Sequence, residues 1–507
     1  MAALVAAISA AAVLTATAPH GPRVTSDSVY YLSTADSIRA GHGLVAFDGV
    51  QVTHWPPGFP GTVAVVGEVA GANSVLGARI LNALCLAFIV LAGWVLLRRH
   101  VSSPALRLGG VAGLAIAPTL FVISSSAWSE PLFVALMLAA TLGLELALER
   151  PGVHRWVIVS ALLAGASFFV RYSGIWLLAT GAFVLLVANR SALTRRERVQ
   201  RAALFLIIAS VLPALVIERN LRLTNGYPFS QRGGPNISVA DAAADEALAI
   251  GRWLVPEAAT SGVRAALATL LLGALAAWTV SWTRRRHTPD SRRDHSRLSD
   301  NSQRVPLWPL ALLASGYLAF LLGSVATAYT DPIGPRLLSP AFVPGVVVAF
   351  AGVDRLLARS APRDSLVAAC AAGIVMWLGA QALATRGEFN RLRADGAGYT
   401  EQRWRSSELL ALVRDRGIRP TFTTRTDALY FGTAIRAGCW PTQTPTVCTQ
   451  SGPNLNLLAV SRSAYLAWFA EPGRTRPFMP AALMRRVRLT EVARVADGRL
   501  YRVSVVR

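Results

Sequence analysis

Apolar runs of about 17 to 25 residues recur along most of this chain, and that length matches the thickness of a bilayer. Charged residues make up only 15% of the 507 residues, whereas soluble globular proteins are nearer a quarter charged. In a bilayer core only helices or closed barrels satisfy the backbone, and these runs have helix length. The sequence therefore predicts an all-α polytopic membrane protein.

The first apolar run, 2–18, is predicted as a retained first helix. A cleaved signal peptide is the alternative, since Ala16-Thr17-Ala18 resembles a cleavage site, but a basic region before the run is missing. With this run, about eleven helices are predicted. The further spans are 75–97, 106–123, 131–148, 156–170, 174–188, 202–218, 262–282, 306–327, 337–353 and 366–384. Val63 to Ala70 is too short to span and is predicted as a partial helix.

The net charge of +22 would suggest a nucleic-acid partner in a soluble protein. Here most loop arginines gather in alternate loops, at 98–107, 150–155, 190–201, 284–304 and 355–363. The positive-inside rule then predicts a cytoplasmic N-terminus, with 19–60, 219–260, 328–336 and the C-terminal region outside. The Arg-rich linker 283–304 has no aromatic residue among its charges, so we expect a topological role and no nucleic-acid partner. An Ala-rich chain without lysine is typical of a GC-rich genome, and we expect a bacterial plasma membrane.

The composition changes at about residue 385, which divides the chain into a transmembrane catalytic domain, 1–384, and a small extracytoplasmic α/β domain, 385–507. The second domain is predicted to hold a helix at Trp404–Arg414, strands at Pro420–Thr424 and Asn456–Val460, a short helix at Ala464–Ala470, and a hairpin of Val487–Val495 with Leu500–Val506. Cys439 and Cys448 are close enough in sequence to be bridged, and both states stay open.

The polar stretch from Thr25 to Pro60 is predicted to be the first extracytoplasmic loop. Asp27 is followed by Tyr30 and by apolar residues at helical spacing, so an amphipathic helix would hold this acid at the membrane face. Such a carboxylate can take a proton from an acceptor hydroxyl. The alternative is a helix cap formed by Ser26 or Asp27. Asp36 is expected to face solvent and Asp48 to form a turn.

The loop ends in Trp55-Pro56-Pro57-Gly58-Phe59-Pro60, a rigid re-entry into apolar sequence. His54 directly precedes this motif. It is a candidate for binding phosphate or sugar, although a lone histidine is also commonly structural.

Five further candidates lie at predicted outer helix ends or loops: the acid Glu130, and Arg171, Tyr172, Arg232 and Arg336, which with Tyr30 and His54 are predicted to bind substrate. Glu130, in Ser129-Glu130-Pro131, is predicted to hold an acceptor hydroxyl, to pair with an arginine, or to cap a helix. Arg171-Tyr172 interrupts an apolar stretch, where an arginine suits a lipid phosphate or simply snorkels. Arg232 contributes to a polar outer loop, and Arg336 stands between Pro335 and Pro340 at headgroup depth.

Together these features resemble the GT-C superfamily of membrane glycosyltransferases. The resemblance rests on an acid after the first helix, then WPPGFP, SEPLF, FVRYSG and PRLLSP, and it covers roughly residues 20 to 350. It is nearest to enzymes that use polyprenyl-phosphate sugars, such as protein O-mannosyltransferases, aminoarabinose transferases and GPI mannosyltransferases. It implies that Asp27 is the catalytic base, that Glu130 is a second catalytic acid, and that Arg336 contacts the lipid phosphate.

The resemblance further implies a polyprenyl-phosphate sugar donor, a glycan, lipid or protein acceptor, and surrounding membrane lipids as partners. Many relatives carry two adjacent acids in the first loop, whereas here Ser26 and Ser28 flank a single Asp27. One carboxylate is a poor site for a divalent ion, so we expect no metal or other cofactor. A transporter or lipid flippase and a non-catalytic membrane assembly subunit remain alternatives, although no symmetric halves, mid-helix charges or nucleotide motif favour a pump.

Overall fold

The computed structural model describes residues 1–188, 192–229, 237–254, 306–327, 333–359, 364–441, 464–470, 476–479 and 481–505. The chain divides into two compact units. The helical unit comprises Met1–Ala16, Thr53–Thr62 and Ala78–Arg391, and the mixed unit comprises Thr17–Val52, Val63–Gly77 and Leu392–Arg507. The first loop and the C-terminal region therefore belong to the same unit.

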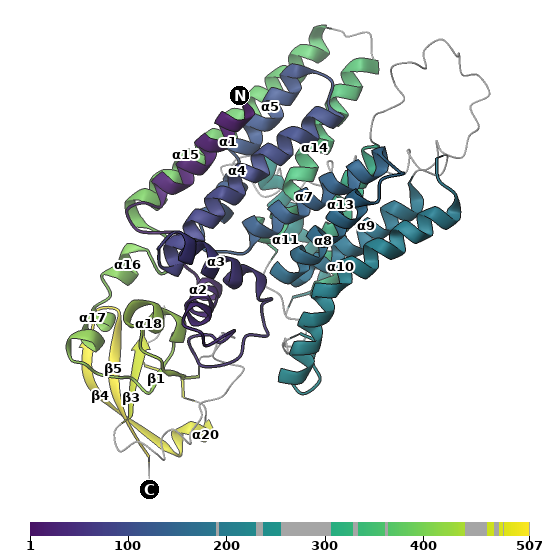
Figure 1. The fold of residues 1–507 in the computed structure, drawn as a ribbon. Coiled ribbons are helices and arrows are strands. Elements are labelled where there is room, and N and C mark those ends of the chain that lie inside the picture. The colour runs from purple at the N-terminus through teal and green to yellow at the C-terminus, as the bar shows by residue number, and fades with distance from the viewer. Residues whose placement is uncertain are drawn as a thin grey trace, which may run out of the picture. The chain divides into compact units, whose positions relative to one another are not determined.

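Helices account for most of the helical unit (Figure 1). They are α1 (Ala2–Ala16), α4 (Ser74–His100), α5 (Pro104–Ala115), α6 (Pro118–Ser124), α7 (Glu130–Glu149), α8 (Arg155–Val170), α9 (Ile175–Val187), α10 (Arg195–Leu223), α11 (Val239–Leu254), α13 (Trp308–Val325), α14 (Pro335–Arg359) and α15 (Asp364–Asp395). Helix α3 (Gly58–Val69) begins in the helical unit and continues into the mixed unit, as α15 does at its end. Among the described residues, 7 helices are long and apolar enough to cross a membrane. Every predicted span coincides with a helix except 262–282, which lies outside the described residues together with the linker 283–304.

Proline marks the start of several of these helices, because the first helical positions need no hydrogen-bond donor. α5, α6, α7 and α13 all carry proline in their first two positions. Pro118 also corrects one prediction, since the expected single helix 106–123 is two helices separated at Ile116 and Ala117. A proline inside a helix removes a backbone hydrogen bond and clashes with the preceding turn, so the helix ends there and a new one begins.

Helices α7, α8, α10 and α9 pack in succession within the helical unit (Figure 1). Small residues allow the backbones to approach closely, as is common in membrane bundles. A Cβ on Gly165 of α8 would lie 2.8 Å from the carbonyl oxygen of Ala209 in α10. One on Gly143 of α7 would lie 3.2 Å from Cβ of Ser160 in α8. This close packing fixes the ends of α7 and α8, where two of the candidate residues lie.

The mixed unit contains a five-stranded sheet in the order β2-β1-β3-β5-β4. The strands are β1 (Phe422–Thr423), β2 (Gly438–Cys439), β3 (Ala464–Phe469), β4 (Val487–Val495) and β5 (Gly498–Val505). β1 pairs in parallel with β2 and β3, whereas β5 pairs antiparallel with β3 and β4. The β4–β5 hairpin confirms that prediction, and α16 (Gln402–Arg405), α17 (Glu408–Asp415), α18 (Thr426–Thr433) and α20 (Ala481–Met484) complete the described part of the region.

The expected short helix at Ala464–Ala470 is wrong, because these residues form the central strand β3. Leu466 and Trp468 face one apolar cluster, while Ala467 and Phe469 face another cluster that includes residues of α17 and α18. A strand covered on both faces reads as a continuous apolar run. Such a run cannot be distinguished from a short buried helix by periodicity alone.

The first loop is built into the mixed unit through its contacts with the C-terminal region. Val24 forms a parallel bridge with Gly398, and its carbonyl accepts from the Tyr399 amide at 2.7 Å. Beyond helix α2 (Ser26–Arg39), the Phe47 ring stacks on Tyr430 of α18, with 4.8 Å between centroids and an interplanar angle of 23°. The C-terminal region therefore fixes the chain before and after α2.

Cysteine pairing is described only in part. Cys439 is disulfide-bonded, whereas Cys85 and Cys370 are free. Cys448 and the expected strand Asn456–Val460 lie outside the described residues.

Candidate active site

Glu130 is the meeting point of two candidate arginines. Its side chain is 1% exposed, and Oε1 accepts from Arg171 Nη1 and from Arg336 Nε, both at 2.6 Å. Oε2 is buried and has no hydrogen-bond partner among the described residues. The N-cap position of α7 falls on Ser129, so Glu130 pairs with arginines rather than capping its helix. Residues 206 positions apart in the chain are thus joined at one carboxylate.

Trp128 and Asn82 support this cluster and were not singled out from the sequence. The Arg336 guanidinium lies over the Trp128 ring, 4.3 Å from its centroid. Asn82 of α4 is fully buried, and its Nδ2 donates to the carbonyls of Ser126 at 2.6 Å and Trp128 at 3.0 Å. This amide therefore holds the loop before α7. In the sequence, Asn82 is a polar residue within a mostly apolar span that also contains Arg79.

Arg171 follows the last residue of α8, where the chain becomes extended and then enters a short 3₁₀ turn at Tyr172–Gly174. The turn leads directly into α9. A Cβ on Gly174 would lie 2.4 Å from the Phe168 amide nitrogen, so this reversal needs glycine. Besides Glu130, Arg171 Nη1 reaches Ser129 Oγ at 3.1 Å.

Tyr172 connects the WPPGFP segment to helix α10. Its hydroxyl donates to the Thr53 carbonyl at 2.7 Å and accepts from Asn220 Nδ2 at 2.8 Å. Gly58 packs beside it on the end of α8, where an added Cβ would lie 2.4 Å from the Phe169 carbonyl. The hydroxyl proton of Tyr172 is therefore engaged within the protein, and the side chain positions the segment that carries His54.

Tyr317 holds the start of α14, where Arg336 is located. Its hydroxyl donates to the Leu337 carbonyl at 3.0 Å, and the ring is 3% exposed. Pro335 occupies the first position of α14. Tyr317 of α13 therefore helps to hold Arg336 in place, together with Glu130 and Trp128.

Two guanidinium groups face one carboxylate in this cluster. Arginine is suited to oxyanions because its planar fork can bind two oxygens at once. The Arg171 and Arg336 side chains are 18% and 23% exposed, so they are partly accessible whereas Glu130 is not. Chemically, the cluster can bind a phosphate group and stabilise negative charge that grows on it.

Asp27 lies in the first turn of α2, in the mixed unit. Thr25 is the N-cap, and its amide donates to Ser28 Oγ at 3.0 Å, so the expected cap at Ser26 or Asp27 is wrong. Burial raises the pKa of Tyr30 well above its usual value, and the nearby Asp48 charge adds to this effect. Tyr30 therefore stays a neutral phenol. Asp36 is exposed, and Asp48 accepts from the Val50 amide at 2.9 Å in the expected turn.

His54 and Arg232 are the remaining candidates. The His54 ring packs edge-on against Trp55, with 4.4 Å between centroids. This is a structural contact and leaves a binding role as a prediction. Arg232 lies outside the described residues.

Glu246 is a buried acid that the sequence analysis missed, because its helix α11 lies in a stretch expected to be an outer loop. It is 3% exposed, and its Oε2 has no described hydrogen-bond partner. Burial raises the pKa of Glu246 to about 7. Unlike Glu130, it has no ion pair with any arginine of the described chain.

No group of three histidine, cysteine, aspartate or glutamate side chains within the described residues is arranged to hold a metal ion.

Comparison with solved structures gives matches over nearly the whole chain. ArnT from Cupriavidus metallidurans bound to undecaprenyl phosphate matches with a TM-score of 0.62 and 15% identity, covering 98% of this chain and 97% of that chain. The chain has the fold of the GT-C membrane glycosyltransferases. The arabinofuranosyltransferase AftD from Mycobacteria matches with a TM-score of 0.54 and 16% identity, covering 99% of this chain and 40% of that chain. The fold that the sequence motifs predicted is thus confirmed.

A third match is the archaeal oligosaccharyltransferase AglB from Archaeoglobus fulgidus, solved with an inhibitory peptide and a dolichol-phosphate. Its TM-score is 0.51 at 11% identity, covering 85% of this chain and 63% of that chain. In sequence, residues 54–217 match the model of the dolichyl-phosphate-mannose-protein mannosyltransferase family. That range includes Glu130 and Arg171 but not Asp27 or Arg336. No curated protein matches the sequence.

Proposed function

We propose that this protein is a glycosyltransferase that moves a sugar from a polyprenyl-phosphate donor to an extracytoplasmic acceptor. The observation that carries the proposal is the cluster of Glu130, Arg171 and Arg336, which presents two partly accessible guanidinium groups, each with a positive charge. The GT-C fold and the ArnT structure bound to undecaprenyl phosphate support a lipid-linked phosphate as the group that this charge serves.

In the proposed reaction Asp27 accepts the proton of an acceptor hydroxyl, and the freed oxygen attacks the anomeric carbon of the donor sugar. The bond between that carbon and the phosphate oxygen breaks, and the polyprenyl phosphate leaves with the bonding electrons. Arg171 and Arg336 stabilise the negative charge that grows on the leaving oxygen. Glu130 holds both guanidinium groups in place, so they do not have to reorganise during the reaction. In this proposal Glu130 positions the two arginines, whereas the sequence resemblance implied that it is a second catalytic acid.

The donor sugar is proposed to be mannose or arabinofuranose. The family model over residues 54–217 supports mannose, because its description names dolichyl-phosphate-mannose as donor. The match to an arabinofuranosyltransferase supports the pentose. A glycan, a lipid or a protein would serve as acceptor.

The proposed topology has a cytoplasmic N-terminus and a reaction on the outer side of a bacterial plasma membrane. Glu130 and Arg171 lie at the ends of α7 and α8 that the arginine distribution assigns to the outside. Cysteine labelling at 290–300 and 490–500 tests this topology, since the two sites must show opposite accessibility.

The function is tested by giving the purified protein a polyprenyl-phosphate mannose or arabinofuranose, with a candidate acceptor, and measuring sugar transfer. Asp27→Asn is expected to lower kcat by about 10²- to 10⁴-fold, the range for loss of a general base. Asp36→Asn is the matched control, because Asp36 is an exposed acid on the same helix. Equal turnover of Asp27→Asn and wild type would remove the proposed base, and sugar-lipid translocation without transfer would favour the flippase alternative.

A further inference from the structure

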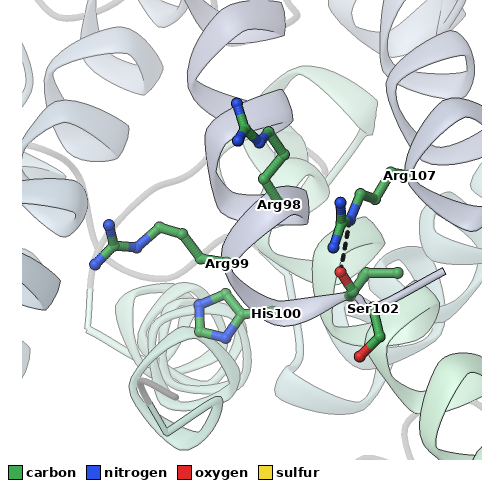
Figure 2. Close-up of a pocket in the computed structure, with 6 residues that line it drawn as sticks. Arg98, Arg99, His100, Ser102 and Arg107 are labelled. Atoms are coloured by element: carbon green, nitrogen blue, oxygen red, sulfur yellow. Dashed lines mark hydrogen bonds between the residues drawn. The ribbon is translucent and has the colours of Figure 1, made fainter. Parts of the chain in front are cut away.

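A polar cavity lies where α4 ends and the chain turns into α5 (Figure 2). Its volume is about 180 Å³, and it is lined by Arg98, Arg99, His100, Val101, Ser102 and Arg107. No acidic side chain lines the cavity, although some of the lining residues pair with acidic side chains that lie outside the lining. The lining is therefore dominated by cationic and hydrogen-bond-donating groups.

The cavity is separate from the Glu130 cluster. Glu145, which contacts His100, and Glu130 both belong to α7 and lie fifteen residues apart, or about 22 Å along a helix. The two sites are thus at opposite ends of one helix that is long enough to span a bilayer. The arginine distribution assigns the cavity end to the cytoplasmic side.

Acids already engage one part of the lining. Arg99 pairs with Glu145 at 2.6 Å and with Glu149 at 2.6 Å, and His100 Nε2 lies 2.7 Å from Glu145 Oε1. The carboxylate of Asp354, in α14, accepts from the backbone amides of Ser102 and Ser103 at 2.8 and 3.0 Å. These contacts fix the shape of the turn and account for the nearby negative charges.

Arg98 and Arg107 are the cations that these acids leave unmatched. Arg107 Nε donates to the Val101 carbonyl at 2.7 Å, which holds its guanidinium beside the turn (Figure 2). Neither arginine forms an ion pair with a residue that the structure describes. Arg98 is exposed and Arg107 is partly buried, so both guanidinium groups are accessible to a ligand.

His100 forms part of the wall without reaching the space inside. Its side chain is 0% exposed, and its Nε2 lies 2.7 Å from Glu145 Oε1. His100 therefore helps to hold the turn between Arg98 and Arg107 in shape.

We propose that this cavity binds a phosphate group, with Arg98 and Arg107 as its charged ligands. Phosphate oxygens accept several charge-assisted hydrogen bonds at once, and arginine is the side chain best suited to supply them. A cavity at the end of a spanning helix lies at headgroup depth, so the phosphodiester of an anionic phospholipid is the natural source, and free inorganic phosphate shares the same chemistry. The site would anchor the corner of α4 and α5 and is independent of the proposed transferase reaction.

The test uses the full-length protein purified in detergent and stripped of lipid. Phosphatidylglycerol, phosphatidylcholine and inorganic phosphate are added separately, and bound lipid is counted by native mass spectrometry alongside a thermal unfolding curve. Wild type is expected to retain a phosphatidylglycerol molecule and to unfold at higher temperature. The double variant Arg98→Gln, Arg107→Gln should bind it at least tenfold more weakly.

The matched control is Arg150→Gln, Arg155→Gln, which removes two arginines from the same expected membrane face but away from the cavity. It should bind phosphatidylglycerol as wild type does. Stabilisation by inorganic phosphate alone, dependent on Arg98 and Arg107, would assign the site to the free ion. The proposal would be overturned if both double variants lost phosphatidylglycerol binding equally. It would also be overturned if neither phosphatidylglycerol nor phosphate bound to the wild type or raised its unfolding temperature.

Discussion

The candidate catalytic residues of the two units are held by different forces. In the helical unit, Glu130, Arg171 and Arg336 are fixed by short charged contacts among side chains at helix ends. In the mixed unit, Asp27 is carried by a helix whose flanks are fixed by backbone pairing of Val24 with Gly398 and by ring stacking. The first region depends on charge, and the second depends on backbone shape.

This difference has a clear physical consequence. A buried carboxylate shared by two cations tolerates no loss of a partner, because an unpaired charge in a low-dielectric region is costly. The stability of a backbone bridge does not depend on side-chain charge. It is reduced by any atom added where the two chain segments come together. Substitutions can therefore separate the two regions, one through electrostatics and the other through sterics.

The largest effect is expected for Glu130→Ala. It leaves Arg171 and Arg336 facing each other without their shared carboxylate, and breaking a buried pair in this way costs about 3–5 kcal/mol. The midpoint of thermal unfolding in detergent should fall strongly. Glu218→Ala, which removes the exposed partner of Arg222, is the control and should change little. Equal midpoints for Glu130→Ala and wild type would show that the cluster is not stabilised by charge.

The next effect is expected for Gly398→Ala in the mixed unit. Gly398 has φ +62°, and an added Cβ would lie 2.1 Å from the Val24 carbonyl oxygen. We expect a loss of about 2–4 kcal/mol from left-handed strain and overpacking together. The displaced loop should lower kcat while donor affinity is retained.

Gly417→Ala provides the control for Gly398→Ala, because Gly417 has φ +60° with nothing within 4 Å of an added Cβ. It should show the strain alone and leave kcat unchanged. If both variants behaved alike, the bridge between Val24 and Gly398 would not hold the first loop.

The third effect concerns the donor. Arg336→Ala should weaken polyprenyl-phosphate binding by about 10- to 100-fold, the range for losing a hydrogen bond to a charged group. Arg336→Lys keeps the charge but loses the planar stacking on Trp128, and we expect an intermediate affinity. Arg222→Ala, an exposed arginine paired with Glu218, is the control. Donor affinity that is unchanged in Arg336→Ala would remove the phosphate role.

The sequence predicted the members of the charged cluster better than their arrangement. Glu130, Arg171 and Arg336 each stood out as a charge at the end of an apolar run, which is a local signal. Two arginines share one carboxylate oxygen because of how helices distant in the sequence pack together. No local sequence pattern predicts that arrangement. Trp128 and Asn82 were missed for the same reason, since each looks like an ordinary residue of an apolar segment.

In the mixed unit the sequence predicted local elements and missed how they combine. The hairpin of β4 and β5 was clear from its alternation and turn. β3 was assigned as a helix because its two covered faces remove the alternation. The pairing of Val24 with Gly398 brings together residues that are far apart in the sequence. A single sequence carries no signal for such a pairing.

The smallest effect is expected from Glu246, which contrasts with Glu130 inside the helical unit. Both carboxyls are buried, but Glu246 forms no ion pair among the described residues, and burial raises its pKa to about 7. The folded protein therefore holds a proton that the unfolded chain releases near the ordinary glutamate pKa, about 4.3. Stability contributed by this group is present below that value and declines as the pH rises to about 7.

Glu246→Gln should remove this decline, because an amide does not titrate. The unfolding midpoint of the variant should fall by less than that of wild type between pH 5 and pH 7.5. Asp245→Asn tests whether any acid on α11 has the same effect, and it should leave the pH profile unchanged. Parallel profiles for wild type and Glu246→Gln would mean that Glu246 is charged in the folded protein. It would then have a cationic partner as Glu130 does, and the contrast between a paired and an unpaired buried acid would be lost.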